Sequence, residues 1–181
     1  HSPKGGECAV CGDNEVSAEG QGACTPCGQH RHKFNHTHCT CDAGFVEDDE
    51  GGCTCEPGKM LVGGGCEGCE EGKFKVESGI HACSLCTKLI PDSVTMIQNS
   101  TSASDCICDR GRYLKDSACV PIYDGVVASQ GMTLESLEIE QGFWRTGPTS
   151  TDVRECPVET ACLGGVNVSS YCLEGHAGPY C

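Results

Sequence analysis

Cysteine is the residue that most constrains how this chain can fold, because 19 of its 181 residues are cysteine. A share above one in ten is typical of small extracellular domains that disulfides, rather than a large apolar core, hold together. Only 38% of the residues are hydrophobic and 5% are aromatic. We therefore expect a small, disulfide-rich, mostly irregular fold with short β-hairpins and little helix, in an oxidising extracellular compartment.

The cysteines alternate between tight and wide spacing along the chain. Cysteines separated by only one or two residues seldom bridge each other without strain, because a disulfide needs Cα atoms about 4.4–6.8 Å apart with converging side chains. The wide gaps, in contrast, mostly hold ten to thirteen residues. Pairing across every wide gap gives consecutive loops that do not cross: Cys11–Cys24, Cys27–Cys39, Cys41–Cys53, Cys55–Cys66, Cys69–Cys83, Cys86–Cys106 and Cys108–Cys119.

The last four cysteines allow two pairings. One is Cys156–Cys162 with Cys172–Cys181, and the alternative is Cys156–Cys172 with Cys162–Cys181. Either way one cysteine of the odd total remains, and it is Cys8. The sequence begins at His1 without an initiator methionine, so either a signal peptide has been removed or the chain is a piece of a longer protein. We expect Cys8 to bond to an upstream segment or to another chain.

Glycine recurs shortly after a cysteine and just before a bulky residue. A glycine with positive φ permits a tight turn, and the bulky side chain that follows can cover a neighbouring disulfide. This internal repeat has four copies: Gly44-Phe45, Gly58-Lys59-Met60, Gly72-Lys73-Phe74 and Gly111-Arg112-Tyr113.

The repeat stops after Cys119, where 36 residues pass without a cysteine. Apolar side chains at 137 and 139 alternate with acids, which predicts a half-buried strand over 134–140 in a small sheet-like unit of its own. Phe143 and Trp144, the only tryptophan, follow. We expect this aromatic pair either to anchor packing between modules or subunits or to fill the core of the small sheet.

The stretch Cys66-x-x-Cys69…Gly72-Lys73-Phe74…Cys83-x-x-Cys86…Cys106-x-Cys108-x-x-Gly111-x-Tyr113 resembles the cysteine-rich, EGF-like repeats of ephrin-receptor type, with a looser version before it. The later stretch from Gly142-Phe143-Trp144-Arg145 to Gly178-Pro179-x-Cys181 resembles a block that follows such repeats in large surface proteins of algae and other protists. Because related repeat proteins build surface filaments such as flagellar hairs (mastigonemes), the resemblance implies an extracellular structural role.

The resemblance and the spacing together predict elongated tandem EGF-like modules. We divide the chain into tandem short disulfide loops over 1–66, an ephrin-receptor-like cysteine-rich repeat over 67–120, a Cys-free β-rich segment over 121–155 and a C-terminal Cys/Gly-rich EGF-like portion over 156–181.

Three Asn-x-Ser/Thr acceptors predict N-linked glycans, at Asn35, Asn99 and Asn167. Asn99 lies in the longest disulfide loop beside the polar run 98–104, which is typical of an exposed tip where a glycan meets no steric conflict. The alternative is that these positions are unmodified polar loops.

The cysteines at 8, 11, 24 and 27 have the spacing of a zinc ribbon, in which four thiolates surround a tetrahedral ion. We favour disulfides, because the same alternation continues into Cys-x-Cys pairs and the glycan acceptors indicate an oxidising compartment. A zinc-ribbon intracellular adaptor requires all of these cysteines to be reduced.

Two further patterns suggest metal ions. Four histidines between His30 and His38 can share one face of a strand, but Arg31 and Lys33 among them would repel a cation. We favour a solvated basic loop that complements acidic surface on a neighbouring copy. The acidic run 47–50 suits calcium, but it lies inside a disulfide loop, where we favour a solvated hairpin tip. We therefore expect no metal and no cofactor.

The 26 acidic and 12 basic residues give a net charge of −14, which repels phosphate backbones and anionic membranes. No apolar run approaches the ~20 residues that cross a bilayer. The sequence also lacks the motifs of zinc proteases, of hydrolase nucleophile elbows and of phosphate-binding loops. These observations argue against nucleic-acid binding, membrane insertion and catalysis.

We therefore predict a secreted, glycosylated structural protein whose partners are copies of itself, in an extracellular surface filament or layer. The alternative is the ectodomain stalk of a receptor or adhesion protein that presents a ligand-binding site.

Overall fold

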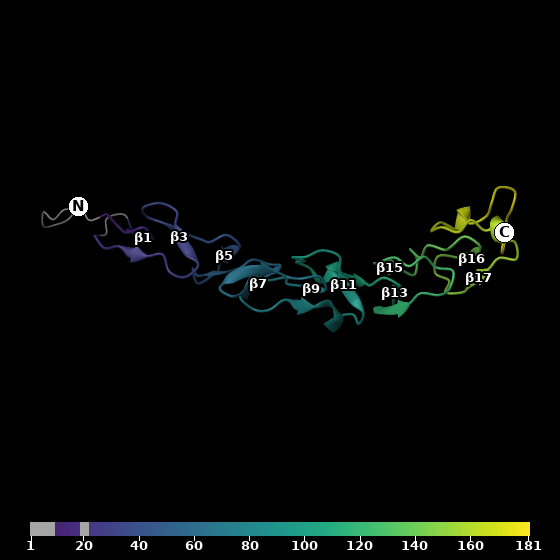
Figure 1. Cartoon of the computed structure of the whole chain (residues 1–181), viewed down its shortest axis with the longest axis horizontal. Coiled ribbons are helices and arrows are strands. Elements are labelled where there is room, and N and C mark those ends of the chain that lie inside the picture. Colours follow the sequence, from purple (N-terminus) through teal and green to yellow (C-terminus); the bar gives the residue numbers. More distant parts are fainter. Residues whose placement is uncertain (1–9, 19–21) are drawn as a thin grey trace. The chain divides into compact units, whose positions relative to one another are not determined.

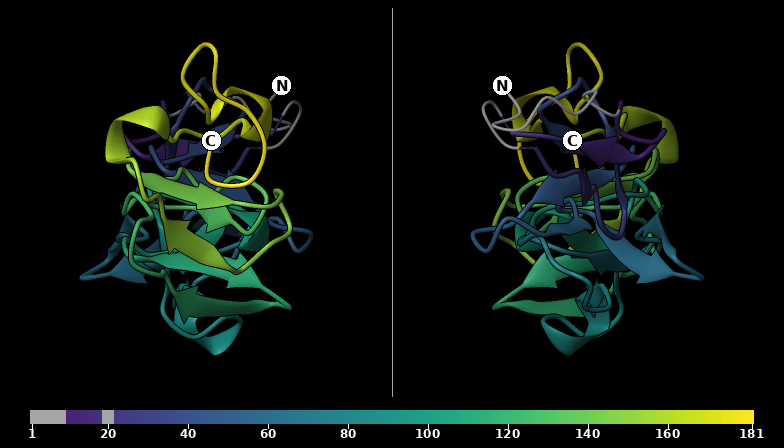
Figure 2. Two further views of the ribbon diagram at one scale, coloured as in Figure 1. Left: turned by 90° about the vertical axis from the view of Figure 1, so that its right-hand side faces the viewer. Right: turned by 90° about the vertical axis from the view of Figure 1, so that its left-hand side faces the viewer.

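The computed structural model describes residues 10–18 and 22–181. Its strands are two to four residues long, and its helical elements are 3-10 turns of three residues. Figures 1 and 2 show these short arrows joined by irregular loops. The expected fold class, small, disulfide-rich and mostly irregular with short antiparallel hairpins, is confirmed.

Contacts within the chain divide it into two units. The first holds the described residues up to Cys69 together with Lys75–Cys83. Its strands pair in chain order as four antiparallel hairpins. They are β1 (Glu15–Val16) with β2 (Thr25–Pro26), β3 (Arg31–Lys33) with β4 (Cys39–Cys41), β5 (Phe45–Glu47) with β6 (Cys53–Cys55), and β7 (Lys59–Val62) with β8 (Gly65–Gly68).

The second unit holds Glu70–Phe74 and Ser84–Cys181. Its two-stranded antiparallel pairs are β9 (Lys73–Phe74) with β10 (Ser84–Leu85), β11 (Ser93–Thr95) with β12 (Cys106–Cys108), and β16 (Phe143–Arg145) with β17 (Val153–Glu155). A three-stranded sheet places β13 (Arg112–Lys115) between antiparallel β14 (Ala118–Pro121) and parallel β15 (Met132–Thr133). Its 3-10 turns are η1 (Cys86–Lys88), η2 (Ala103–Asp105), η3 (Glu159–Ala161) and η4 (Val168–Ser170).

The same tight turn precedes five strands. At Gly111, the Arg112 N–H donates to the Asp109 carbonyl at 3.1 Å, and glycine takes a φ of +80° at the third turn position. A type II turn requires positive φ at this position, where a side chain is strained. The turns begin at Asp42, Glu56, Glu70, Asp109 and Glu140. Four contain the glycines of the sequence repeat, and the fifth, Glu140-Gln141-Gly142-Phe143, has no cysteine shortly before it.

The main apolar core lies in the second unit and consists of Tyr113, Val126, Met132, Leu137, Ile139 and Tyr171. The Cys-free segment was expected to form a unit of its own. Instead, its Leu137 and Ile139 share this core with Tyr113, which precedes the segment, and with Tyr171, which follows it. Burial raises the pKa of the Tyr113 hydroxyl, which is hydrogen-bonded to the Tyr123 hydroxyl.

Arg145 is the largest side chain that is fully buried among the described residues. Its Nη1 donates to the Leu134 carbonyl at 2.9 Å, and its Nη2 donates to the Leu137 carbonyl at 3.1 Å. Its Nε donates to the Tyr171 hydroxyl at 3.1 Å, and further bonds reach the carbonyls of Glu135 and Pro148. One guanidinium thus organises the backbone of the Cys-free segment.

This arrangement explains why the expected strand over 134–140 is wrong. Residues 134–136 form a turn, and Ile139 makes only isolated bridges, to Val126 and Gly165. The carbonyls that a strand would direct to a neighbouring strand bond to Arg145 instead. A buried backbone carbonyl needs a hydrogen-bond donor, and a side-chain N–H can fill this role as well as the backbone N–H of a neighbouring strand.

We predict that Arg145→Met lowers the free energy of unfolding by about 3 kcal/mol or more, because several buried carbonyls lose a charged donor at once. Arg154→Met is the matched control, since Arg154 is exposed and its contacts, an ion pair with Asp152 and an interaction with the Tyr180 hydroxyl, lie at the surface. Its effect should stay within about 0.5 kcal/mol. Denaturant unfolding under non-reducing conditions, followed by Trp144 fluorescence, measures both. Equal losses in the two variants would contradict the role assigned to Arg145.

Candidate functional site

The described residues contain nine disulfides, each joining consecutive described cysteines. Seven are the pairs given by the wide gaps of the sequence. The tail adopts Cys156–Cys162 and Cys172–Cys181, one of the two alternatives left open. Cys8, expected to be unpaired within the chain, lies outside the described residues. We call this series of nine bonds the disulfide ladder.

Three strands carry the connections of the ladder from one loop to the next. β4, β6 and β12 each read Cys-x-Cys, and side chains two residues apart share one face of a strand. In β6, Cys53 bonds back to Cys41 while Cys55 bonds forward to Cys66. Each of these strands therefore closes one loop and opens the next.

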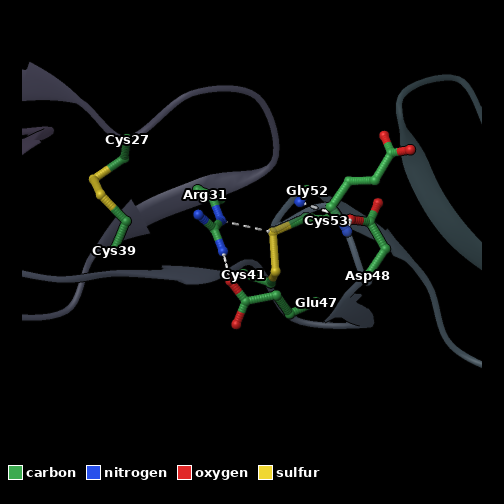
Figure 3. Close-up of polar contacts among 9 residues, drawn as sticks. Cys27, Arg31, Cys39, Cys41, Glu47, Asp48, Gly52 and Cys53 are labelled. Atoms are coloured by element: carbon green, nitrogen blue, oxygen red, sulfur yellow. Dashed lines mark hydrogen bonds and ion pairs between the residues drawn. A yellow bond between two sulfur atoms is a disulfide. The ribbon is translucent and has the colours of Figure 1, made fainter.

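Arg31 on β3 joins two neighbouring loops of the first unit (Figure 3). It belongs to the loop closed by Cys27–Cys39, and its Nε donates to the Cys53 Sγ at 3.2 Å. Its Nη2 forms an ion pair with the Glu47 carboxylate on β5. Because Glu47 is largely exposed, the ion pair contributes little to stability. Sulfur is a weak acceptor, so the two contacts together position Arg31 rather than add much free energy.

The histidine-rich loop packs against the same neighbouring loop. His30 stacks on Phe45 with ring centroids 4.3 Å apart, and the His32 Nδ1 lies 2.8 Å from the Asp42 carboxylate. His38 instead contacts Thr37, its neighbour in sequence. We expected this basic loop to complement acidic surface on a neighbouring copy. The structure shows part of that complementarity inside one chain.

The residues considered as metal ligands have other roles in the structure. Cys11, Cys24 and Cys27 are in disulfides. The Asp48 carboxylate accepts the backbone N–H groups of Glu50 at 3.1 Å and Gly52 at 2.7 Å, which closes the hairpin tip. Across residues 10–18 and 22–181, no group of three or more His, Cys, Asp or Glu side chains is placed to hold a metal ion.

The three glycan acceptors are exposed in the structure. The Asn35 Oδ1 accepts the Thr37 hydroxyl at 3.0 Å, and the Asn167 Oδ1 accepts the Ser169 hydroxyl at 2.8 Å. Asn99 differs, because its φ is +61° and the next residue, Ser100, is buried. All three amides are accessible to a glycan, and their glycosylation stays a prediction.

Phe143 and Trp144 lie on β16 and pack against the core of the second unit. The Phe143 ring occupies the space beside Gly125, where an added Cβ would lie 2.2 Å from the ring. Trp144 packs against Tyr180 with ring centroids 5.2 Å apart. Both side chains therefore contribute to their own core, as one alternative expected. Because each is only partly buried, an interface role remains a prediction.

No protein-family model matches the chain, and no curated protein matches it at a significant level. The many disulfides and short hairpins are compatible with EGF-like modules, and they indicate an oxidising, extracellular environment. No helix in the described part of the chain has the length and apolar character that a membrane span requires.

We predict that the unreduced protein carries nine disulfides within each chain, which lower the mass of the chain by two hydrogens for each bond. Proteolysis without reduction should yield Cys156 linked to Cys162 and Cys172 linked to Cys181. Peptides that link Cys156 to Cys172 would contradict the tail pairing. A reduced mass with bound zinc would contradict the disulfide ladder as a whole.

Proposed function

We propose that this protein is a secreted or cell-surface structural protein that assembles with copies of itself into an extracellular filament or layer. The observation that carries the proposal is the disulfide ladder. Neighbouring loops are joined by Cys-x-Cys strands or by short connecting segments. When the chain is stretched, the disulfides that close the loops limit how far each loop can extend. Such local fastening suits a load-bearing component, and stability then grows as a sum of neighbouring terms.

The same proposal includes the type of module, the glycans and the interface residues. The modules are ephrin-receptor-type EGF-like repeats of the kind found in filament proteins of protist surfaces. They carry N-linked glycans at Asn35, Asn99 and Asn167. Phe143 and Trp144 use their exposed faces at contacts between modules or subunits, because large aromatic side chains concentrate interface energy. The protein performs no catalysis and binds no nucleic acid.

A receptor or adhesion stalk is the second candidate, since consecutive disulfide-linked hairpins also suit a spacer. The two functions differ in what the chain binds. A filament protein binds itself, whereas a stalk stays monomeric and presents a ligand site.

We predict that the purified protein self-associates with rising concentration, as measured by sedimentation velocity, and that electron microscopy of the assembled material shows regular filaments or sheets. The reason is mass action, because the fraction of associated copies rises with protein concentration. A monodisperse monomer at every concentration, together with tight binding of a different protein, would favour the stalk.

We also predict that Cys8→Ser removes disulfide-linked oligomers from a non-reducing gel while non-covalent association persists. The odd cysteine count motivates this expectation. The control is the unreduced mass of the variant, which should still show nine disulfides. Covalent oligomers that survive the substitution would assign the intermolecular bond to another cysteine.

A further inference from the structure

The tip of the β3–β4 hairpin carries an aromatic ring that is open to water. Phe34 is 73% exposed, whereas the other Phe, Tyr and Trp side chains that the structure describes are buried or partly buried. Phenylalanine is among the residue types most often found inside proteins, because its ring gains free energy when it leaves water. The tip therefore presents apolar surface that the described part of the chain leaves uncovered.

The shape of the tip keeps this ring apart from other apolar side chains. The N–H groups of Phe34 and Asn35 both donate to the His38 carbonyl, at 3.0 and 3.2 Å, and residues 35–38 are polar and exposed. A single ring covers far less than the roughly 800 Å² that each partner of a stable protein interface buries. A small apolar group therefore suits Phe34 better than the surface of a second protein.

The side chain that follows Phe34 is held in one orientation. The Asn35 Oδ1 accepts the N–H groups of Thr37 at 2.9 Å and His38 at 2.8 Å, and the Thr37 hydroxyl at 3.0 Å. The Asn35 Nδ2 donates no hydrogen bond to the residues that the structure describes. N-linked glycans attach to this nitrogen. Because the oxygen of the amide is held, the folded loop sets the direction in which a glycan leaves the chain.

The same neighbourhood recurs at the other two glycan acceptors. Each acceptor asparagine follows a large, exposed apolar side chain by one or two residues. The exposed fractions are 73% for Phe34 before Asn35, 63% for Ile97 before Asn99 and 50% for Val166 before Asn167. Isolated apolar side chains on a surface are common, but here each described acceptor has one beside it. The pairing indicates that the sugar and the apolar side chain cover each other.

The first sugar of an N-linked glycan, N-acetylglucosamine, has the chemistry to cover an aromatic ring. One face of its ring presents C–H groups, while its hydroxyls lie at the edge. The face of an aromatic ring carries partial negative charge and attracts weakly positive hydrogens. Stacking the two faces removes apolar surface from water and leaves the hydroxyls solvated. Phe34 offers such a face, whereas Ile97 and Val166 offer only aliphatic surface.

We propose that the first sugar of the glycan on Asn35 packs against the Phe34 ring and fixes the glycan to the tip of the β3–β4 hairpin. The sugar then covers the aromatic surface that the folded hairpin leaves open, and the bonds to the Asn35 Oδ1 hold it there at little further cost in conformational freedom. This packing rests on the proposed glycosylation of Asn35 and specifies what the glycan contacts.

Hydroxyl-radical oxidation measures the exposure of Phe34 directly. In protein secreted by a eukaryotic host, the glycosylated fraction should oxidise at Phe34 several-fold more slowly than Thr37→Val does. This substitution removes the acceptor and keeps the backbone N–H groups that hold the Asn35 Oδ1. Thr37→Ser is the matched control, because it keeps the hydroxyl and the acceptor, and its glycosylated fraction should protect Phe34. Leu89, which is 54% exposed and follows no acceptor, should oxidise equally in all three.

Trimming the glycan separates packing of the first sugar from general shielding. An endoglycosidase that leaves one N-acetylglucosamine on Asn35 should leave Phe34 protected. NMR of this form should show sugar C–H protons shifted upfield by the ring, a shift that Phe34→Leu removes. Loss of protection on trimming, or equal oxidation of Phe34 with and without the sugar, overturns the packing while glycosylation stands. Peptide masses that show Asn35 without sugar overturn the proposed glycosylation of Asn35, and the packing with it.

Discussion

The structure depends on loops that disulfides close one after another. A hairpin with strands of two to four residues is marginal alone in water, because it buries little and orders much. Closing a loop of this size removes about 3 kcal/mol of conformational freedom from the unfolded chain in the entropic model. The Cys-x-Cys strands β4, β6 and β12 then connect successive closures, because their two side chains leave the same face toward different loops.

The Cys-free part of the second unit is stabilised by different means. Here an apolar core takes the place of disulfides. Arg145 donates hydrogen bonds to backbone carbonyls that have no partner in a neighbouring strand. Both solutions meet the same requirement, that a chain with few long strands must still satisfy its buried backbone groups. The tight acid-x-Gly turn occurs both in the disulfide ladder and in the Cys-free segment. It precedes β9, where a cysteine lies just before the turn, and β16, where none does.

The sequence indicates those features that depend on local geometry and hides those that depend on distant partners. Cysteine spacing predicts the pairs across the wide gaps, because loop length and steric exclusion act locally. The turn at Gly142 was missed because we tied the repeat to cysteine, although its acid-x-Gly-Phe pattern was visible. The strand predicted over 134–140 does not form, because Arg145, several residues later, donates hydrogen bonds to its carbonyls.

The net charge limits how such a chain can assemble. Copies that each carry a charge of −14 repel one another at distances beyond any contact, and salt screens this repulsion over roughly 8 Å at physiological ionic strength. A close pair in a partly enclosed cavity is screened much less than the long-range repulsion. Self-assembly of an acidic protein therefore favours a few unpaired cations placed opposite enclosed acids over broad charged surfaces.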